Sequence, residues 1–359
     1  MAYTTIDDPS KYFQIATWTG SASTDTITFG GNSDLQLDLL WSKSRSNSHS
    51  HALMDTSRVT SGDYLPLFAD TDDEEQAAYD SELQSITSDG FTVGTQPHAG
   101  ADGKTYVGYG WKANGGTRTT NTESGDNPAG GYQANTTAGF SIVDYVGTGA
   151  AGTKTHGLGA VPHVMIVKNR ATANQDWIVY HHKNTAAPET DYLYLNDTAA
   201  TADTDGFWND TAPTSSVFTL KDNTRVNDDG VNIIAYLFTE IQGYSKFGSY
   251  TGNGNADGPF VYLGFKPAWL MVKNTTSSRH WQIMDNKRST SNVIDDYLQA
   301  NADGTEATGS SQHKFDFLSN GFKLRGTADN VNDDGDTHIF MAFAEQPFVS
   351  SKGVPCTAR

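Results

Sequence analysis

The chain has 359 residues, with 36% hydrophobic and 18% charged residues, so it can form more than one globular domain with a buried core. Its formal net charge of -18 disfavours binding to nucleic-acid phosphates and to anionic membrane surfaces. The single cysteine, Cys356, excludes an intrachain disulfide and a cysteine metal site. No apolar run approaches the length of a membrane span, and the N-terminus lacks secretory signals, so we expect synthesis in a cytoplasm and no membrane insertion.

Short apolar runs separated by Gly, Asn, Thr, Ser and Asp predict a mostly β chain. Residues 1–112 are predicted to form a first, diverged sandwich repeat, in which Leu39-Leu-Trp-Ser-Lys43 is a central strand. The only segment that favours a helix runs from Asp73 to Leu83. Residues 113–138 are rich in Gly, Thr and Asn and are predicted to be a flexible or edge-running linker.

The string VNDDG occurs at residues 226–230 and again at 331–335, and each copy is followed by an apolar run. Strings further upstream also align, for example Val161-Pro-His-Val-Met-Ile-Val-Lys168 with Lys266-Pro-Ala-Trp-Leu-Met-Val-Lys273. These matches predict a second repeat at 139–243 and a third at 244–359 with a C-terminal tail, so the chain carries three copies of one repeat of about 105 residues. Because no linker separates the second and third copies, we expect one rigid unit that would suit a rod or a shell.

Turn signals every 8–12 residues are typical of sandwich folds. The predicted fold class is therefore all-β, with tandem antiparallel β-sandwiches. The VNDDG strings are interpreted as turns, because Asp-Gly supplies the backbone conformation that tight turns need. The alternative is a calcium site, made by Asp228 and Asp229 or by Asp333 and Asp334, although the ligand spacing of a known calcium loop is absent.

Other residue patterns suggest binding sites, each with a structural alternative. His49 and His51 alternate on an extended segment and could hold a metal, but a polar exposed segment is the preferred interpretation. His181 and His182 would point to opposite faces of a strand. Trp208 stands in a polar loop, Gly206-Phe-Trp-Asn-Asp, and is the one residue that we predict to contact a sugar ring or a partner protein at the surface.

Two further recurring positions are interpreted as structural. The lysines at the ends of apolar strands should cover apolar surface while their charge stays in water. The tryptophans one strand later should lie in the sandwich core rather than form a platform for sugars. These residues are Lys43, Lys168 and Lys273 for the first set, and Trp177 and Trp281 for the second.

The sequence contains no Gly-x-Ser-x-Gly elbow, phosphate-binding loop or zinc-protease helix. Glycan hydrolysis would need two carboxylates at a suitable separation, and 42 acidic residues supply such pairs by chance. We therefore name no catalytic, cofactor-binding or metal-binding residue, and we expect a protein that is not an enzyme.

Several long strings resemble one protein family: Met1-Ala-Tyr-Thr-Thr-Ile-Asp-Asp-Pro-Ser, Gln133 to Val143, Ser249 to Phe265 and Met341 to Phe348. The chain resembles a family of structural proteins of marine bacteriophages that carries a domain of unknown function and is often labelled tail fibre. This resemblance implies a virion component, made in the bacterial host cytoplasm, with lectin-like or jelly-roll sandwiches. It supplies no binding residues.

The resemblance leads to a leading function and two alternatives. The leading expectation is a tail fibre or fibre-like appendage that contacts the host surface. A capsid decoration or tail-body protein without receptor binding is the alternative, and a glycan-degrading enzyme ranks last. Expected partners are further copies of the chain, with a trimer as the guess, other virion proteins and a host cell-surface glycan or protein.

Overall fold

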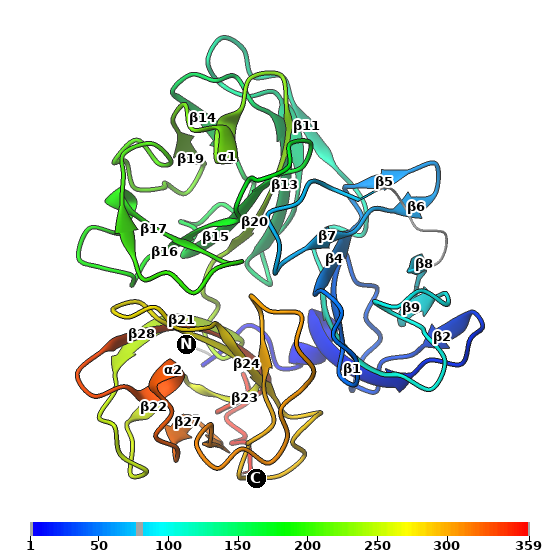
Figure 1. Cartoon of the computed structure of the whole chain (residues 1–359), viewed down its shortest axis with the longest axis vertical. Helices are drawn as coiled ribbons and strands as arrows, with labels where there is room; N and C mark the ends of the chain where they lie inside the picture. Colours follow the sequence, from blue (N-terminus) through cyan, green and yellow to red (C-terminus); the bar gives the residue numbers. More distant parts are fainter. Residues whose placement is uncertain (1–2, 77–81, 358–359) are drawn as a thin grey trace.

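The computed structural model describes residues 3–76 and 82–357, and these form three β-rich lobes around a common centre (Figure 1). The first lobe covers residues 13–111, the second 119–238 and the third 245–347. All paired strands are antiparallel, so the all-β prediction with antiparallel sheets is confirmed. None of the described helices is long and apolar enough to cross a membrane.

The lobes are built from the following elements. The first lobe is preceded by η1 (Pro9–Lys11) and contains β1 (Phe13–Thr19), β2 (Asp25–Ile27), β3 (Leu39–Ser44), β4 (Ala52–Asp55), β5 (Val59–Thr60), β6 (Asp63–Tyr64), β7 (Leu67–Phe68), β8 (Leu83–Thr87), β9 (Gly90–Val93) and β10 (Thr105–Trp111). The second contains β11 (Thr119–Asn121), β12 (Gly130–Asn135), β13 (Phe140–Val146), β14 (Gly152–Thr155), β15 (Val164–Asn169), β16 (Ile178–His181), η2 (Pro188–Thr190), β17 (Asp191–Tyr194), β18 (Ala202–Asp203), β19 (Val217–Leu220), α1 (Thr224–Asn227) and β20 (Asn232–Phe238). The third contains β21 (Ser245–Thr251), β22 (Phe260–Tyr262), β23 (Phe265–Asn274), β24 (Gln282–Asp285), β25 (Leu298–Gln299), β26 (Phe315–Leu318), β27 (Gly321–Leu324), α2 (Asp329–Asn332) and β28 (Thr337–Pro347).

One order of strands recurs in the large sheets of all three lobes. The orders are β1-β10-β3-β4-β7, then β13-β20-β15-β16-β17 within a longer sheet, then β21-β28-β23-β24-β25. Each lobe also has a smaller sheet, made of β2-β9-β8, β14-β19 and β22-β27-β26. In every lobe the last long strand therefore returns to lie between two earlier strands: β10 between β1 and β3, β20 between β13 and β15, and β28 between β21 and β23.

The large sheets are buried on both faces, which explains their continuous apolar runs. The outer face of each sheet packs on a core of its own lobe, and the inner faces of all three meet in one shared core. Aromatic side chains dominate the centre: the ring of Trp111 lies 5.8 Å from that of Trp269 and 5.6 Å from that of Phe343, centroid to centroid. Tandem repeats in the sequence thus close into a ring in space and do not extend as a rod.

The N-terminal segment closes this ring against the third lobe. The Tyr3 hydroxyl donates to the Gly264 carbonyl oxygen at 2.8 Å, and the Thr4 hydroxyl donates to the Gln242 carbonyl oxygen at 2.7 Å. Asp7 accepts hydrogen bonds from the backbone and the hydroxyl of Ser351. The first and last segments of the ring are therefore joined by specific bonds.

Two segments differ from the sequence-based expectation. Residues 113–138, predicted as a linker, contribute β11 and β12 to the edge of the eight-stranded sheet of the second lobe, where β12 pairs with β13 over six residues. The helix predicted from Asp73 to Leu83 lies partly at 77–81, outside the described residues. The described part of it is not helical, because residues 73–76 are irregular and Leu83 begins β8.

Candidate functional site

The candidate site lies at one of the three junctions between lobes, and it is best understood by comparing the junctions. Each lobe carries an equivalent backbone hydrogen bond at the same end of one strand pair, which is β3–β4, β15–β16 or β23–β24. These bonds are Thr56 N to Asp38 O at 2.9 Å, His182 N to His163 O at 2.8 Å and Asn286 N to Ala268 O at 2.9 Å. Each of these pairs packs against the next lobe, so the three pairs occupy equivalent places.

At the junction of the second and third lobes, two imidazoles fill this place. The rings of His163 and His182 lie 4.4 Å apart, centroid to centroid, and His182 Nε2 donates to the Phe247 carbonyl oxygen at 2.6 Å. Burial lowers the pKa of His182 to about 4. This junction is therefore filled by neutral rings at pH 7.

At the junction of the first and second lobes, a hydrogen-bonded amide fills the place. Gln133 Nε2 donates to the Thr56 hydroxyl at 3.1 Å and to the Ser57 hydroxyl at 2.6 Å. The Thr56 hydroxyl in turn donates to Asp38 Oδ1 at 3.0 Å. The strand β12, which has no counterpart in the strand orders of the other lobes, supplies this glutamine.

At the junction of the third and first lobes, Ala268 and Asn286 are too small to fill the space, and a pocket of about 400 Å³ results. Its mouth is formed by exposed residues of the 30–32 loop, of the 287–290 segment and of the end of β28. The lining residues are Ser10, Phe13, Gln14, Ile15, Gly30, Gly31, Asn32, Ala268, Asn286, Lys287, Thr290, Ala344, Glu345 and Gln346.

A buried glutamine holds the loop at the mouth. Gln14 Nε2 donates to the carbonyl oxygens of Ser10 at 2.9 Å and Ser33 at 2.7 Å, and its Oε1 accepts from Gly31 N at 2.8 Å. A Cβ atom on Gly31 would lie 2.4 Å from this oxygen, so a larger residue here would displace the Gln14 amide. Because its amide is saturated by the backbone, Gln14 shapes the wall of the pocket.

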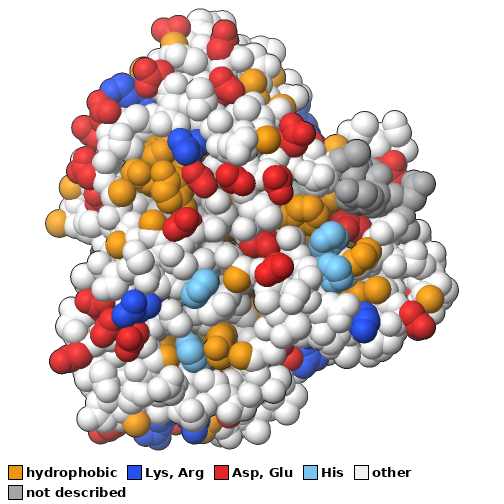
Figure 2. Space-filling view, viewed as in Figure 1, with side chains coloured by type: hydrophobic (Ala, Val, Ile, Leu, Met, Phe, Trp, Pro, Cys, Tyr) orange, Lys and Arg blue, Asp and Glu red, His pale blue; other side chains and the backbone are white. Residues whose placement is uncertain are grey.

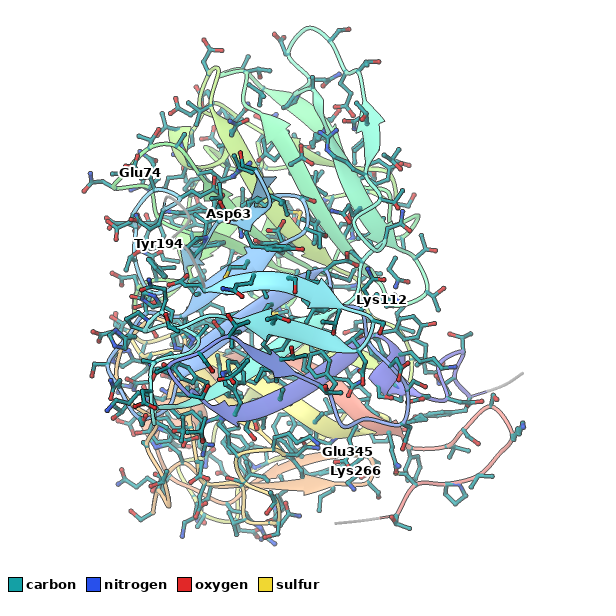
Figure 3. All side chains as sticks on the ribbon, turned by 90° about the vertical axis from the view of Figure 1, so that its right-hand side faces the viewer. Asp63, Glu74, Lys112, Tyr194, Lys266 and Glu345 are labelled. Atoms are coloured by element: carbon teal, nitrogen blue, oxygen red, sulfur yellow. The ribbon has the colours of Figure 1, made fainter. Side chains whose placement is uncertain are left out.

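The carboxylate of Glu345, on β28, forms part of the pocket wall next to β23. Glu345 Oε1 lies 3.0 Å from Lys266 Nζ, and Glu345 Oε2 accepts from Asn286 Nδ2 at 2.6 Å. Figure 3 labels Lys266 and Glu345 next to each other at the ends of these strands. Asn286 is only 7% exposed, and its Oδ1 has no hydrogen-bond partner among the described residues. The wall thus contains an ion pair, Lys266–Glu345, whose charges balance, and the buried amide of Asn286.

The chain matches the model of a family described as a domain of unknown function, DUF7483, over residues 8–347. It belongs to this family. No curated protein and no solved structure matches the chain. Because the matched residues span all three lobes, the DUF7483 domain corresponds to the whole ring and not to a single lobe.

The structure corrects the prediction for Trp208. Its side chain is 1% exposed, its indole NH donates to the Asp191 carbonyl oxygen at 3.1 Å, and its ring packs 6.0 Å from that of Tyr180. The prediction of a surface contact is wrong, because the polar loop folds back and uses the indole to close the outer core of the second lobe.

The paired histidines do not form joint metal sites in the described structure. His51 is buried and accepts from the indole NH of Trp41 at 3.0 Å, whereas the His49 ring lies 5.5 Å from that of His98. His181 and His182 both bond to backbone carbonyl oxygens of the third lobe. Among the described residues, no group of three or more His, Cys, Asp or Glu side chains is placed to hold a metal ion.

The three recurring lysines are buried, so the prediction that their charges stay in water is wrong. Their ammonium groups bond to backbone carbonyl oxygens instead, and two of them reach the neighbouring lobe. Lys43 Nζ donates to Asp303 O at 3.1 Å, and Lys273 Nζ donates to Thr198 O at 3.0 Å. Lys168 Nζ donates to Gln175 O, whose own backbone NH bonds to Asp72 O of the first lobe at 3.0 Å. By contrast, Trp177 and Trp281 lie in the shared core as predicted.

The repeated VNDDG string ends a one-turn helix before it turns. Its asparagine is buried and fastens the loop after the first strand of its lobe: Asn332 Nδ2 donates to Asn255 O at 2.9 Å and its Oδ1 accepts from Asn253 N at 2.9 Å. Asn227 makes the equivalent bonds to Ala150 O and Thr148 N. The string therefore recurs because it locks two loops together in each of the second and third lobes.

The sequence alone did not point to the pocket. Its lining comes from five separate segments, which only the ring brings together. One signal was present, since the aligned strings read Val161-Pro-His163 in the second lobe and Lys266-Pro-Ala268 in the third. The histidine that fills the junction in the second lobe is thus a small alanine in the third.

Proposed function

We propose that this chain is a structural component of a bacteriophage virion, a short fibre-like appendage or knob that contacts the host surface. The resemblance of its long strings to phage structural proteins supports the virion location. The observation that carries the contact role is the pocket at the junction of the third and first lobes.

A junction between rigid lobes is a suitable place for recognition. The lobes share one core, so the pocket walls are held in place before any ligand arrives, and less ordering is needed on binding. The surface also fits an exposed particle component: acidic side chains are spread over the face in Figure 2, and the net charge of -18 favours solubility.

The test has two parts. Mass spectrometry of purified particles should detect the chain among the virion proteins. The purified, fluorescently labelled protein should then bind host cells saturably and compete with adsorption of the intact phage. Absence from the particles would contradict the virion location, whereas presence without cell binding would contradict only the contact role.

A capsid decoration or tail-body role is the second candidate, and the three-lobed ring favours it. Virion sites are symmetric, and a molecule with three similar lobes offers three similar faces to a site of threefold symmetry (Figure 1). Imaging of particles would then place one ring on each such site, and the labelled protein would not bind cells.

A further inference from the structure

We propose that the pocket at the junction of the third and first lobes binds a neutral sugar residue of a glycan. This inference deepens the proposed contact role and rests on it for its biological meaning. The binding itself is a property of the purified protein and is tested separately.

The first step of the argument is that the pocket replaces a filled junction. Protein interiors are close-packed, and the two equivalent places are filled by imidazoles in one case and by a hydrogen-bonded glutamine in the other. The junction with Ala268 and Asn286 has a pocket of about 400 Å³, which lies within the usual range for small-molecule sites.

The second step concerns the charge of the ligand. The Glu345 carboxylate would repel an anionic ligand. Because this carboxylate is already paired with Lys266 at 3.0 Å, it also attracts a cationic ligand only weakly. The buried floor around Phe13 and Ala268 carries no charge, and the charged side chains of the lining, Lys287 and Glu345, are of opposite sign. A neutral molecule therefore fits the pocket best.

The third step concerns the hydrogen-bonding groups at the mouth. Asn32 and Gln346 each offer donors and an acceptor, and Thr290 offers a hydroxyl that does both. A hydroxyl on the ligand is likewise a donor and an acceptor, so a ring with several hydroxyls matches this set. The apolar floor at Phe13 and Ile15 suits the CH face of such a ring.

The experiment uses the full chain on a glycan array of neutral mono- and oligosaccharides, with acidic sugars such as uronic acids for contrast. The bound members are then titrated calorimetrically. The main variant is the double substitution Ala268→His and Asn286→His, which rebuilds the histidine pair of the neighbouring junction inside the pocket. Ala268→Leu is a second, smaller filling, and Ser215→His on an exposed loop is the matched control.

The expected result is binding of a neutral saccharide that falls at least tenfold in the double variant and in Ala268→Leu, and stays within twofold in Ser215→His. Circular dichroism and melting temperature would show that the variants are folded. No binding on the array, binding of acidic sugars alone, or equal affinity in a folded, filled variant would each overturn the assignment. None of these outcomes would affect the detection of the protein in particles.

Discussion

At the residue scale, buried ion pairs join the lobes at two of the three junctions. Arg58 Nε lies 2.6 Å from Asp55 Oδ2 in the first lobe, and Tyr236 of the second lobe donates its hydroxyl to the same oxygen at 2.6 Å. Burial alone would lower the pKa of Arg58, but the neighbouring Asp55, Tyr236 and Glu75 raise it above its usual value. Glu75 also binds Arg170 of the second lobe at 2.7 Å. The pair is thus part of a network across the junction.

The same arrangement of tyrosine, aspartate and arginine recurs between the third and first lobes. It is absent from the junction of the second and third lobes. Tyr109 donates its hydroxyl to Asp285 Oδ2 at 3.0 Å, and Arg288 binds both Asp285 and Glu306. Where the second and third lobes meet, His181 stands in place of the aspartate and Met341 in place of the tyrosine, as the strand registers show. A hydrogen bond from His181 Nε2 to the Phe340 carbonyl oxygen at 3.1 Å takes the place of the ion pair there.

This comparison leads to an expected ranking of two substitutions. Arg58→Met leaves the buried Asp55 carboxylate without its partner and should lower the free energy of unfolding by about 3–5 kcal/mol. Tyr236→Phe removes one hydrogen bond and keeps the ion pair, so about 1–2 kcal/mol should be lost. Denaturant unfolding of both variants measures the difference. Equal losses would contradict a network centred on the arginine.

The buried lysines should make stability depend on pH. Burial lowers the pKa of Lys273 to about 7, below the usual value of 10.5 that it regains on unfolding. Between these values the unfolded chain binds a proton that the folded chain lacks, so stability rises with pH across this window. The slope for one such group is about 1.4 kcal/mol per pH unit.

Substitution of Lys273 by Met should remove this lysine's contribution to the rise of the free energy of unfolding with pH. From pH 7.5 to 9, the free energy of unfolding of the wild type should gain about 1.4 kcal/mol per pH unit relative to Lys273→Met. The window ends below pH 10, where buried tyrosines with raised pKa values, such as Tyr250, begin to act in the opposite sense. Lys352→Met, at an exposed position, is the control and should leave the slope unchanged.

At the scale of elements, indoles fasten one lobe to the next. The indole NH of Trp177, just before β16, donates to Phe68 O of β7 at 2.8 Å, and that of Trp281, just before β24, donates to Tyr194 O of β17 at 2.8 Å. His51 occupies the equivalent position before β4, but its Nε2 has no hydrogen-bond partner among the described residues. The second lobe is thus bonded to the first, and the third to the second, by an indole in the same direction around the ring.

Within a lobe, the asparagine of VNDDG connects the one-turn helix to the loop after the first strand. Asn332→Ala should remove its bonds to Asn253, Asn255 and Gly326 and lower the free energy of unfolding by about 2–4 kcal/mol, since buried backbone groups lose their partners. Asp334→Ala alters an exposed residue of the same string and should cost less than about 0.5 kcal/mol. Thermal unfolding of both variants decides whether the asparagine is the residue that matters.

At the scale of the whole molecule, the shared core makes the three lobes depend on one another. Each large sheet turns an apolar face to the centre, and separation of the lobes would expose side chains such as Trp111, Trp177 and Trp269 to water. Burial of large aromatic side chains dominates the energetics of such a core. The ring is therefore expected to unfold as one cooperative unit.

Expression of residues 113–243 alone, which keeps β11 and β12 with the rest of the second lobe, tests this expectation. The isolated segment should be unfolded or aggregated, because nothing covers the inner face of its large sheet. Circular dichroism and size-exclusion chromatography would show it, and calorimetry of the whole chain should give a single transition. A soluble segment with its own sharp melting transition would contradict a shared core.

The sequence by itself determined the local structure. Alternation of short apolar runs with Gly and Asp turns established antiparallel strands, and the aligned strings around Lys168 and Lys273 indicated equivalent strands with equivalent registers. The core position of Trp177 also followed, because an aromatic residue that recurs in matching strands is needed for packing. These features depend on neighbours along the chain, which a sequence displays directly.

Only the tertiary structure decided the ring, the burial of the lysines and the pocket. An apolar run does not say which partner covers its second face, so the inner faces could not be assigned to a common centre. The polar loop around Trp208 folds inward onto the carbonyl oxygen of Asp191. Lys43 bonds to the carbonyl oxygen of Asp303 in another lobe, 260 positions away in the sequence. The pocket exists because Ala268 faces the first lobe where His163 faces the third, and this facing is set by closure of the ring alone.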